Sequence, residues 1–185
     1  MRIKSIPITI MSLAALFSYS PQVLAAPDFY SIGVAGEAQQ RSNWCWAASD
    51  VSILDYFGET VTQREVVIAV KGSVVNQGGT DAEAQDGLDN WGVTSTRTAS
   101  SLSFSSIKNE IYVHERPIYS GWSWNSGGGH AVVIDGYDEG SKNYVEYMDP
   151  LDGVFCNSKM QSLAANLCRT LPTSIQKNLG RLHAG

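Results

Sequence analysis

Apolar residues recur at helical spacing in one stretch near the start of the chain. The stretch begins at Asn43 and ends before Gly58, a glycine suited to close a helix, so the sequence predicts a helix over residues 43–57. One stripe of side chains and its flanks would face the core of the protein. The stripe and its flanks comprise Trp44, Ala47, Ala48, Val51, Leu54, Asp55 and Phe57.

Two capping boxes predict two more helices. Thr62-x-x-Glu65 precedes the apolar run VVIAV and a stop at Gly72, and Thr80-x-x-Glu83 opens a shorter helix that ends near residue 91. In a capping box the threonine and the glutamate each satisfy a backbone N–H that the first helical turn leaves without a partner. The segment GSVVNQGGT between the two helices is predicted to be a flexible loop.

The pattern changes from helical to alternating after Gly92. Residues 93–98 alternate like a strand, and SFSSIKNEIYVHE resembles one more short helix with a serine cap. RPIYSGW, HAVVIDGY and NYVEYMD are strand-like runs rich in β-branched and aromatic residues, and DEGSKN joins the last two as a hairpin. Because helices come first and strands later, the sequence predicts an α+β fold.

The segments before the first predicted helix and after the last predicted strand carry weaker patterns. Residues 27–42 read as irregular and polar, and the C-terminal segment is ambiguous apart from a candidate helix over 160–167. His183 lies in the C-terminal tail, where disorder is the default expectation.

The first 25 residues have the three parts of a secretory signal peptide. Arg2 and Lys4 form a positive start, residues 8–17 are apolar, and Val23-Leu24-Ala25 is a small-residue cleavage site. The apolar run is shorter than the roughly 20 residues that span a bilayer, although an N-terminal anchor or a core helix is the alternative interpretation. We expect residues 1–25 to be removed and residues 26–185 to form a single domain in the periplasm or outside the cell.

Cleavage would make the protein more acidic. The full chain has 13 basic and 18 acidic residues, and removal of two basic residues, 13 − 2 = 11, leaves a net charge of 11 − 18 = −7. An acidic surface argues against nucleic-acid partners and against docking on anionic lipid. After signal cleavage we therefore expect no nucleic-acid partner and no membrane association.

Two of the three cysteines are expected to pair, and the third is expected to be free. Cys156 and Cys168 are close in sequence, and an exported protein meets an oxidising compartment, so we expect them to form a disulfide. Such a bridge would contribute about 3 kcal/mol in the chain-entropy model. Cys45 remains as a candidate reactive thiol.

Cys45 and His130 are the candidate nucleophile and base. Cys45 lies near the start of the first predicted helix, where backbone N–H groups and the helix dipole stabilise a thiolate; the alternative is a buried cysteine acting as a small hydrophobic residue. His130 follows three glycines at the mouth of an apolar strand, although a lone histidine is usually structural. His114, at a predicted helix end, is assigned a solvated or capping role.

Asp149 and Gln39 complete the candidate site. The hairpin turn near Gly140 would bring Asp149 beside residue 130 or 131, where it could orient the imidazole; an ordinary Asp-Pro turn is the alternative. Gln39 lies six positions before the cysteine, where its amide and the cysteine N–H could stabilise an oxyanion. Gln40 competes for that role.

These residues resemble the papain-like cysteine peptidases. The order and spacing of Gln39, Cys45-Trp46-Ala47, His130 and Asp149 are similar to that family, and SNWCWAAS, RPIYSGWSWNSGGGHAVVIDGYD and YMDP resemble its compact bacterial branch. That branch includes secreted effector proteases of plant pathogens and the leader-cleaving domains of bacteriocin exporters. The resemblance covers most of residues 37–150.

The resemblance has consequences for fold and chemistry. It implies an N-terminal helical half packed on a C-terminal antiparallel sheet half with the active-site cleft between them, a thioester acyl-enzyme, a protein or peptide substrate, and neither metal nor cofactor. Three features depart from larger relatives: Ser42 replaces an extra cysteine, Asp149 replaces asparagine, and 13 residues (26–38) leave no room for a long propeptide.

Four tryptophans flank the two candidate catalytic residues. Trp122 and Trp124 alternate on the approach to His130, and they are candidate substrate-binding residues or core residues of the sheet. Trp44 and Trp46 straddle the cysteine and are assigned to packing of the helix start.

Three functions fit the sequence. The first is peptide-bond hydrolysis by an exported cysteine peptidase. An amidase, a deamidase or a transglutaminase-like acyl transferase would use the same triad and the same acyl intermediate. A papain-like protein that binds peptides without turnover is the third, and the filled catalytic positions argue against it.

Overall fold

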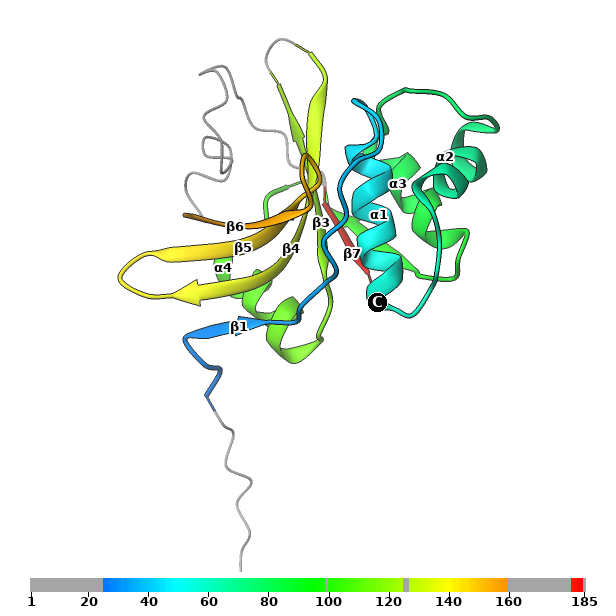
Figure 1. The fold of residues 1–185 in the computed structure, drawn as a ribbon. Coiled ribbons are helices and arrows are strands. Elements are labelled where there is room, and N and C mark those ends of the chain that lie inside the picture. The colour runs from blue at the N-terminus through cyan, green and yellow to red at the C-terminus, as the bar shows by residue number, and fades with distance from the viewer. Residues whose placement is uncertain (1–24, 99, 125–126, 160–180, 185) are drawn as a thin grey trace, which may run out of the picture.

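The fold has a helical half and a sheet half, as expected for an α+β protein (Figure 1). A computed structural model of the chain describes residues 25–98, 100–124, 127–159 and 181–184. The helical elements in these ranges are α1 (Cys45–Tyr56), α2 (Gln63–Lys71), α3 (Asp81–Asp89), α4 (Phe104–Lys108) and the π-helical turn η1 (Asn109–Val113). The strands in these ranges are β1 (Phe29–Ser31), β2 (Ser95–Thr98), β3 (Ile118–Ser123), β4 (Gly129–Glu139), β5 (Asn143–Asp149), β6 (Val154–Lys159) and β7 (Arg181–Ala184).

Both predicted capping boxes are present. Thr62 accepts a hydrogen bond from the Glu65 N–H and Glu65 accepts one from the Thr62 N–H at the start of α2, and Thr80 and Glu83 repeat the arrangement at α3. Gly72 ends α2 at a φ of 74°, in the left-handed region that favours glycine. The sequence signals that act within one helical turn therefore predicted these helix ends correctly.

More residues of helix α1 are buried than the predicted apolar stripe contains. Nine consecutive residues, 46–54, are buried, because the helix packs against α2, α3 and the sheet. Asp55 and Phe57 are exposed at its C-terminal end. Because this helix lies at the centre of the helical half, neighbouring elements cover it on all sides over residues 46–54. A single apolar stripe therefore underestimates how many of its residues are buried.

The strands form one antiparallel sheet in the order β2-β7-β3-β4-β5-β6, and β1 also pairs with β4. Two apolar cores lie against this sheet. Ala131 and Val133 of β4 pack with α1, whereas Val132 and Ile134 pack with Ile107 and its neighbours in α4 and η1. Burial of both faces explains the nearly continuous apolar run in β4.

Three strands lie where the sequence analysis expected none. β1 lies within the segment assigned as irregular, β6 follows the expected final strand, and β7 contains His183, which pairs with Ile118 of β3. The expectation of a disordered tail at His183 is therefore wrong. The candidate helix over 160–167 and residues 1–24 of the expected signal peptide lie outside the described residues. In the described part of the chain, no helix is long and apolar enough to cross a membrane.

Candidate active site

Cys45 is the first residue of α1 and lies at the junction of the two halves. Its side chain is partly exposed, and the structure describes it as a free cysteine. The first N–H groups of an α-helix have no intrahelical acceptor, and with the helix dipole they favour negative charge at this end. The position therefore suits a nucleophilic thiolate.

His130 is the second residue of β4 and faces Cys45. Its ring is buried, and Nε2 lies 2.8 Å from Asp149 Oδ1. Cys45 and His130 line the same cavity, and the interaction of their side chains helps to raise the pKa of His130. Since Nε2 is engaged with the carboxylate, Nδ1 is the ring nitrogen left for the thiol, and the three side chains form a Cys–His–Asp chain.

The charges at this site favour the imidazolium form. Burial lowers the pKa of His130, but the hydrogen bonds and negative charges of Asp149 and Cys45 outweigh it and raise the pKa from 6.5 to about 9. A protonated His130 beside Cys45 could stabilise negative charge on the sulfur and could donate a proton to a bound substrate.

Asp149 reaches His130 diagonally rather than from directly opposite. The register pairs Met148 with Val133, so continuing it by one residue sets Asp149 against residue 132, not 130 or 131 as expected. The difference comes from the turn, which is centred on residue 141 because Glu139 pairs with Asn143. A bulge between Ile134 and Gly136 then moves Asp149 one position closer to His130 than the turn alone would place it. Diagonal neighbours on one face of a sheet remain within reach of long side chains.

The turn after β5 holds the Asp149 carboxylate in place. Leu151 N–H donates to Asp149 Oδ1 at 3.0 Å, and Gly153 N–H donates to the Asp149 backbone carbonyl at 2.8 Å. The Asp-Pro turn that the sequence offered as an alternative is thus present together with the histidine contact.

Trp122 supports the histidine ring from the sheet. It lies opposite His130 across β3 and β4, and the two ring centroids are 6.1 Å apart in an edge-to-face arrangement. Its indole is 5% exposed and belongs to the core, although it also borders the cleft described below. Trp124 is half-buried and lines the cleft. The substrate-binding role of both residues stays a prediction.

Gln39 lies beside the cysteine, where the sequence predicted it. Its backbone N–H donates to Pro150 O at 2.6 Å, and its side-chain Nε2 donates to Arg41 O at 2.9 Å. Gln39 lines the cleft with Cys45, whereas the competing Gln40 is exposed and its backbone N–H donates to Gln63 Oε1. Gln39 is therefore the better placed of the two candidate oxyanion donors.

A cleft runs across Cys45 and His130 as two adjoining cavities. One has a volume of about 350 Å³ and is bordered by Asp81, Tyr119 and Gly121, and the other has a volume of about 520 Å³. Five residues line both: Cys45, Gly78, Gly128, Gly129 and His130. A substrate chain in this cleft would pass directly over the cysteine–histidine pair.

The glycines before His130 allow conformations and close contacts that other residues would not. Gly127 and Gly128 have φ values of 86° and 78°, in the left-handed region. A Cβ at Gly129 would collide with the backbone carbonyl of Trp122. Substitution in this run would therefore displace the strand that carries His130.

Residues 75–80, here called the wall loop, connect α2 to α3, and residues 76–80 of this loop line the cleft. Trp44 Nε1 donates to Val75 O at 2.8 Å, and Trp46 Nε1 donates to Gln77 O at 3.1 Å. Both indoles are buried, which confirms that these tryptophans pack the helix start. The segment expected to be flexible is thus tied to the helix that carries the nucleophile.

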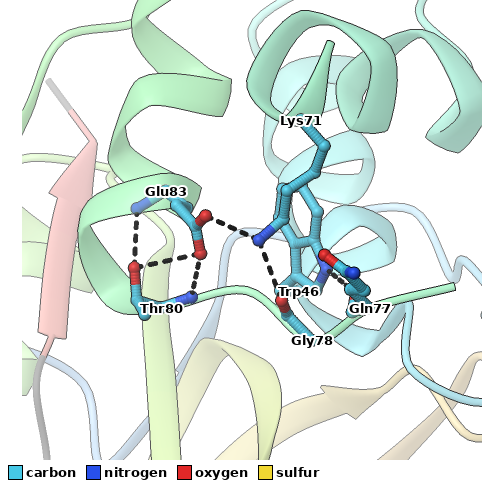
Figure 2. Close-up of polar contacts among 6 residues, drawn as sticks. All are labelled: Trp46, Lys71, Gln77, Gly78, Thr80 and Glu83. Atoms are coloured by element: carbon cyan, nitrogen blue, oxygen red, sulfur yellow. Dashed lines mark hydrogen bonds and ion pairs between the residues drawn. The ribbon is translucent and has the colours of Figure 1, made fainter. Parts of the chain in front are cut away.

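Lys71 fixes the same wall loop from α2, and sequence reasoning missed it. Its Nζ donates to Gly78 O at 3.0 Å and pairs with Glu83 Oε1 at 2.6 Å, while Glu83 also closes the capping box with Thr80 (Figure 2). A lysine in the last turn of one helix and a glutamate in the first turn of the next could have indicated this ion pair.

Only one of the two cysteines of the expected disulfide lies within the described residues. Cys156 lies in β6 and is buried, whereas Cys168 lies outside the described residues. The pairing of the two cysteines stays a prediction.

Asp149→Asn is expected to move the alkaline limb of kcat/KM to lower pH. Because the carboxylate raises the pKa of His130 towards 9, its loss lets the imidazolium deprotonate earlier, by on the order of one pH unit. An amide still accepts the Nε2 hydrogen bond, so we expect a fall in kcat/KM of roughly 10- to 100-fold rather than complete loss. Asp152→Asn removes the same charge from the same turn and is the control; an unmoved alkaline limb in Asp149→Asn would contradict the assignment.

Comparison with known proteins gives one family. The sequence model described as papain-like cysteine protease AvrRpt2 matches residues 29–167 of the 185-residue chain. No curated protein matches the chain in sequence.

Several solved structures have a similar fold. One is a double glycine motif protease from an AMS/PCAT transporter in complex with the leader peptide, with 17% identity, a TM-score of 0.55, and coverage of 83% of this chain and 93% of that chain. Another is the peptidase domain of Streptococcus ComA, with 12% identity, a TM-score of 0.56, and coverage of 82% and 98%. UfSP from C. elegans has 12% identity, a TM-score of 0.56, and coverage of 91% and 35%.

At identities this low the likeness to solved structures extends to the fold alone. The two transporter peptidase domains nevertheless match the chain over most of both lengths, with a helical half against an antiparallel sheet. The expected architecture, with the helical half packed on the sheet half, is thereby confirmed.

Proposed function

Because this chain belongs to the papain-like cysteine protease family described as AvrRpt2, we propose that it hydrolyses peptide bonds with Cys45 as nucleophile, assisted by His130 and Asp149. The observation that carries the proposal is the contact chain from Cys45 through the His130 ring to Asp149 Oδ1, which lies 2.8 Å from Nε2. The family match supports cysteine peptidase activity in general, and the roles of these side chains are our inference.

The first half of the reaction forms a thioester. The Cys45 thiolate attacks the substrate carbonyl carbon, and the carbonyl π electrons move to oxygen to give a tetrahedral oxyanion. The His130 imidazolium donates its Nδ1 proton to the nitrogen of the scissile bond, the carbon–nitrogen bond breaks, and the amine leaves. In the second half, neutral His130 takes a proton from water as the water oxygen attacks the thioester carbonyl carbon. The carbon–sulfur bond breaks, the acid leaves, and the thiolate and the imidazolium are restored.

The oxyanion would be held by two donors. The N–H of Cys45 lies in the first helical turn, where no intrahelical acceptor is available, and the side-chain amide of Gln39 borders the same cleft. The hydrogen bond from Gln39 Nε2 to Arg41 O holds that amide in a fixed orientation and leaves its second N–H for the oxyanion. Such preorganised donors commonly supply the largest part of transition-state stabilisation.

We further propose that the enzyme works after export. The support is the positive start, short apolar run and small-residue site in residues 1–25, together with an odd cysteine left over for chemistry. The intact mass of protein recovered from the exported fraction tests this: a chain that begins at Ala26 is expected, and a full-length chain would contradict the assignment.

Mass analysis of reaction products tests the proposed chemistry. Purified mature protein is incubated with a peptide mixture, with and without added small amines, and Cys45→Ala is the inactive control. Peptidase action gives two shorter peptides from each substrate. Release of ammonia from a side chain without chain cleavage would instead indicate a deamidase or an amidase, and joining of a peptide to the amine would indicate an acyl transferase. Peptide binding without any product would indicate a non-catalytic protein.

A further inference from the structure

The wall of the smaller cavity contains an acidic side chain that the proposed reaction does not use. Asp81 is the first residue of α3, and it borders the cavity of about 350 Å³ together with Cys45 and His130. Its carboxylate lies over Gly121 of β3, where a Cβ would collide with Asp81 Oδ1. The glycine therefore makes room for the carboxylate beside the cysteine–histidine pair.

Asp81 is half-buried and lacks a cationic partner. Within the described ranges, neither a hydrogen bond nor an ion pair engages its side chain. Burial raises the pKa of Asp81, and the charge of the exposed Arg97 on β2 opposes that rise without forming an ion pair. A half-buried carboxylate without a partner is costly, and a cation that enters the cavity would remove much of that cost.

The charged residues near Asp81 on α2 and α3 already have partners. Glu83 is paired with Lys71 and Thr80, and Lys71 is held between Glu83 and the Gly78 carbonyl (Figure 2). Lys71 is therefore not a partner for Asp81, and Glu83 does not compete with Asp81 for a substrate cation. The same contacts fix the wall loop and the start of α3, so Asp81 projects from a rigid element.

The rest of the cavity suits a long side chain with a charged end. Tyr119, Trp46 and Trp122 supply aromatic surface, against which the methylene stem of lysine or arginine can pack. Burial first, and then nearby negative charges including Asp50 and Asp81, raise the pKa of Tyr119 well above its ordinary value, so its phenol stays neutral.

We propose that this cavity binds a lysine or arginine side chain of the substrate near the scissile bond, with Asp81 as the specificity-determining residue. This inference rests on the proposed peptidase function. A charge-assisted hydrogen bond to Asp81 is stronger than one between neutral groups, and it distinguishes basic from neutral residues of similar size. The contact is made by the substrate side chain, so Asp81 sets which peptides are cleaved and leaves the bond-breaking step to Cys45 and His130.

Cleavage-site profiling with matched variants tests the proposal. Mature wild type, Asp81→Asn and Asp81→Lys are profiled on a peptide library, and the control is Asp89→Asn, which removes an exposed carboxylate from the same helix. We expect wild type to prefer lysine or arginine at one position by at least about tenfold in kcat/KM over neutral residues. Asp81→Asn should lose this preference, Asp81→Lys should favour acidic residues at that position, and Asp89→Asn should behave as wild type.

A preference that is absent in wild type, or unchanged in Asp81→Asn, would overturn the proposal. Thermal unfolding of Asp81→Asn is measured in parallel, because an acidic residue in the first turn also stabilises a helix. A lower melting temperature with unchanged specificity would assign Asp81 to the helix end alone and reject the subsite. Hydrolysis of neutral peptides and labelling of Cys45 by a thiol-alkylating epoxide report separately on the catalytic site. A protein that cleaves no peptide overturns both proposals, whereas one that cleaves without preference overturns only the subsite.

Discussion

Replacing Cys45 by alanine is expected to lower kcat/KM for peptide hydrolysis by about 10⁴-fold or more, to the background of the assay. The reason is the absence of another nucleophile in position: without Sγ no thioester can form, and the remaining oxyanion donors only polarise the bound carbonyl. The fold should persist, because α1 already has alanine at positions 47 and 48 and is held by its buried centre. Initial rates for a peptide found by cleavage-site profiling check this expectation.

Cys45→Ser is the matched variant. It replaces the sulfur with a smaller hydroxyl oxygen near His130, so a similar loss of activity would show that the reaction needs a thiolate and not merely a polar group. Both variants should still bind substrate, which can be measured by calorimetry. Retention of wild-type hydrolysis in Cys45→Ala, or epoxide labelling elsewhere than Cys45, would contradict the assignment of the nucleophile.

Local signals predicted the helices well because they act over three or four residues. The two capping boxes, Thr62 with Glu65 and Thr80 with Glu83, are both formed as the sequence suggested. The extent of burial of α1 was not predictable in the same way. Ser49 and Ser52 are polar and yet fully buried, because packing from several sides encloses the helix and Ser52 donates to Ala35 O at 2.6 Å.

The order of Cys45, His130 and Asp149 along the chain predicted that they would meet, and the structure brings them together. The sequence did not predict how they meet. A bulge at residue 135 shifts the hairpin register by one position, and nothing in an alternating pattern marks such a bulge in advance. The turn alone would set Asp149 opposite Val133, and the bulge moves it opposite Val132. From there a diagonal pair on one face of the sheet joins the Asp149 and His130 side chains.

The rest of the cleft depends on contacts between distant segments. Lys71 of α2 reaches the wall loop and Glu83 of α3, and Asp81 of α3 lies over Gly121 of β3. Both arrangements depend on how separate elements pack together. The same holds for β1 and β7, which are short and gain their stability by pairing with β4 and β3. Periodicity within a short segment carries no information about such partners.

Replacing His130 by alanine is expected to lower kcat/KM by about 10³- to 10⁵-fold, the second-largest effect at this site. The loss combines two functions of one ring. The imidazolium stabilises the neighbouring thiolate, and it supplies the proton without which the amine is a poor leaving group. The rate of Cys45 alkylation at mildly acidic pH should therefore fall together with hydrolysis.

The matched control is His114→Ala, because His114 is exposed at the end of η1 and lies outside the cleft. It should leave both alkylation and hydrolysis at wild-type levels. Added imidazole is a second measurement: a small base that enters the space left by the ring should partly restore hydrolysis in His130→Ala and should not affect Cys45→Ala. Loss of hydrolysis in His130→Ala without any change in Cys45 alkylation would contradict the ion pair. A histidine that only donates the proton to the leaving amine would not alter the reactivity of the thiol before substrate binds.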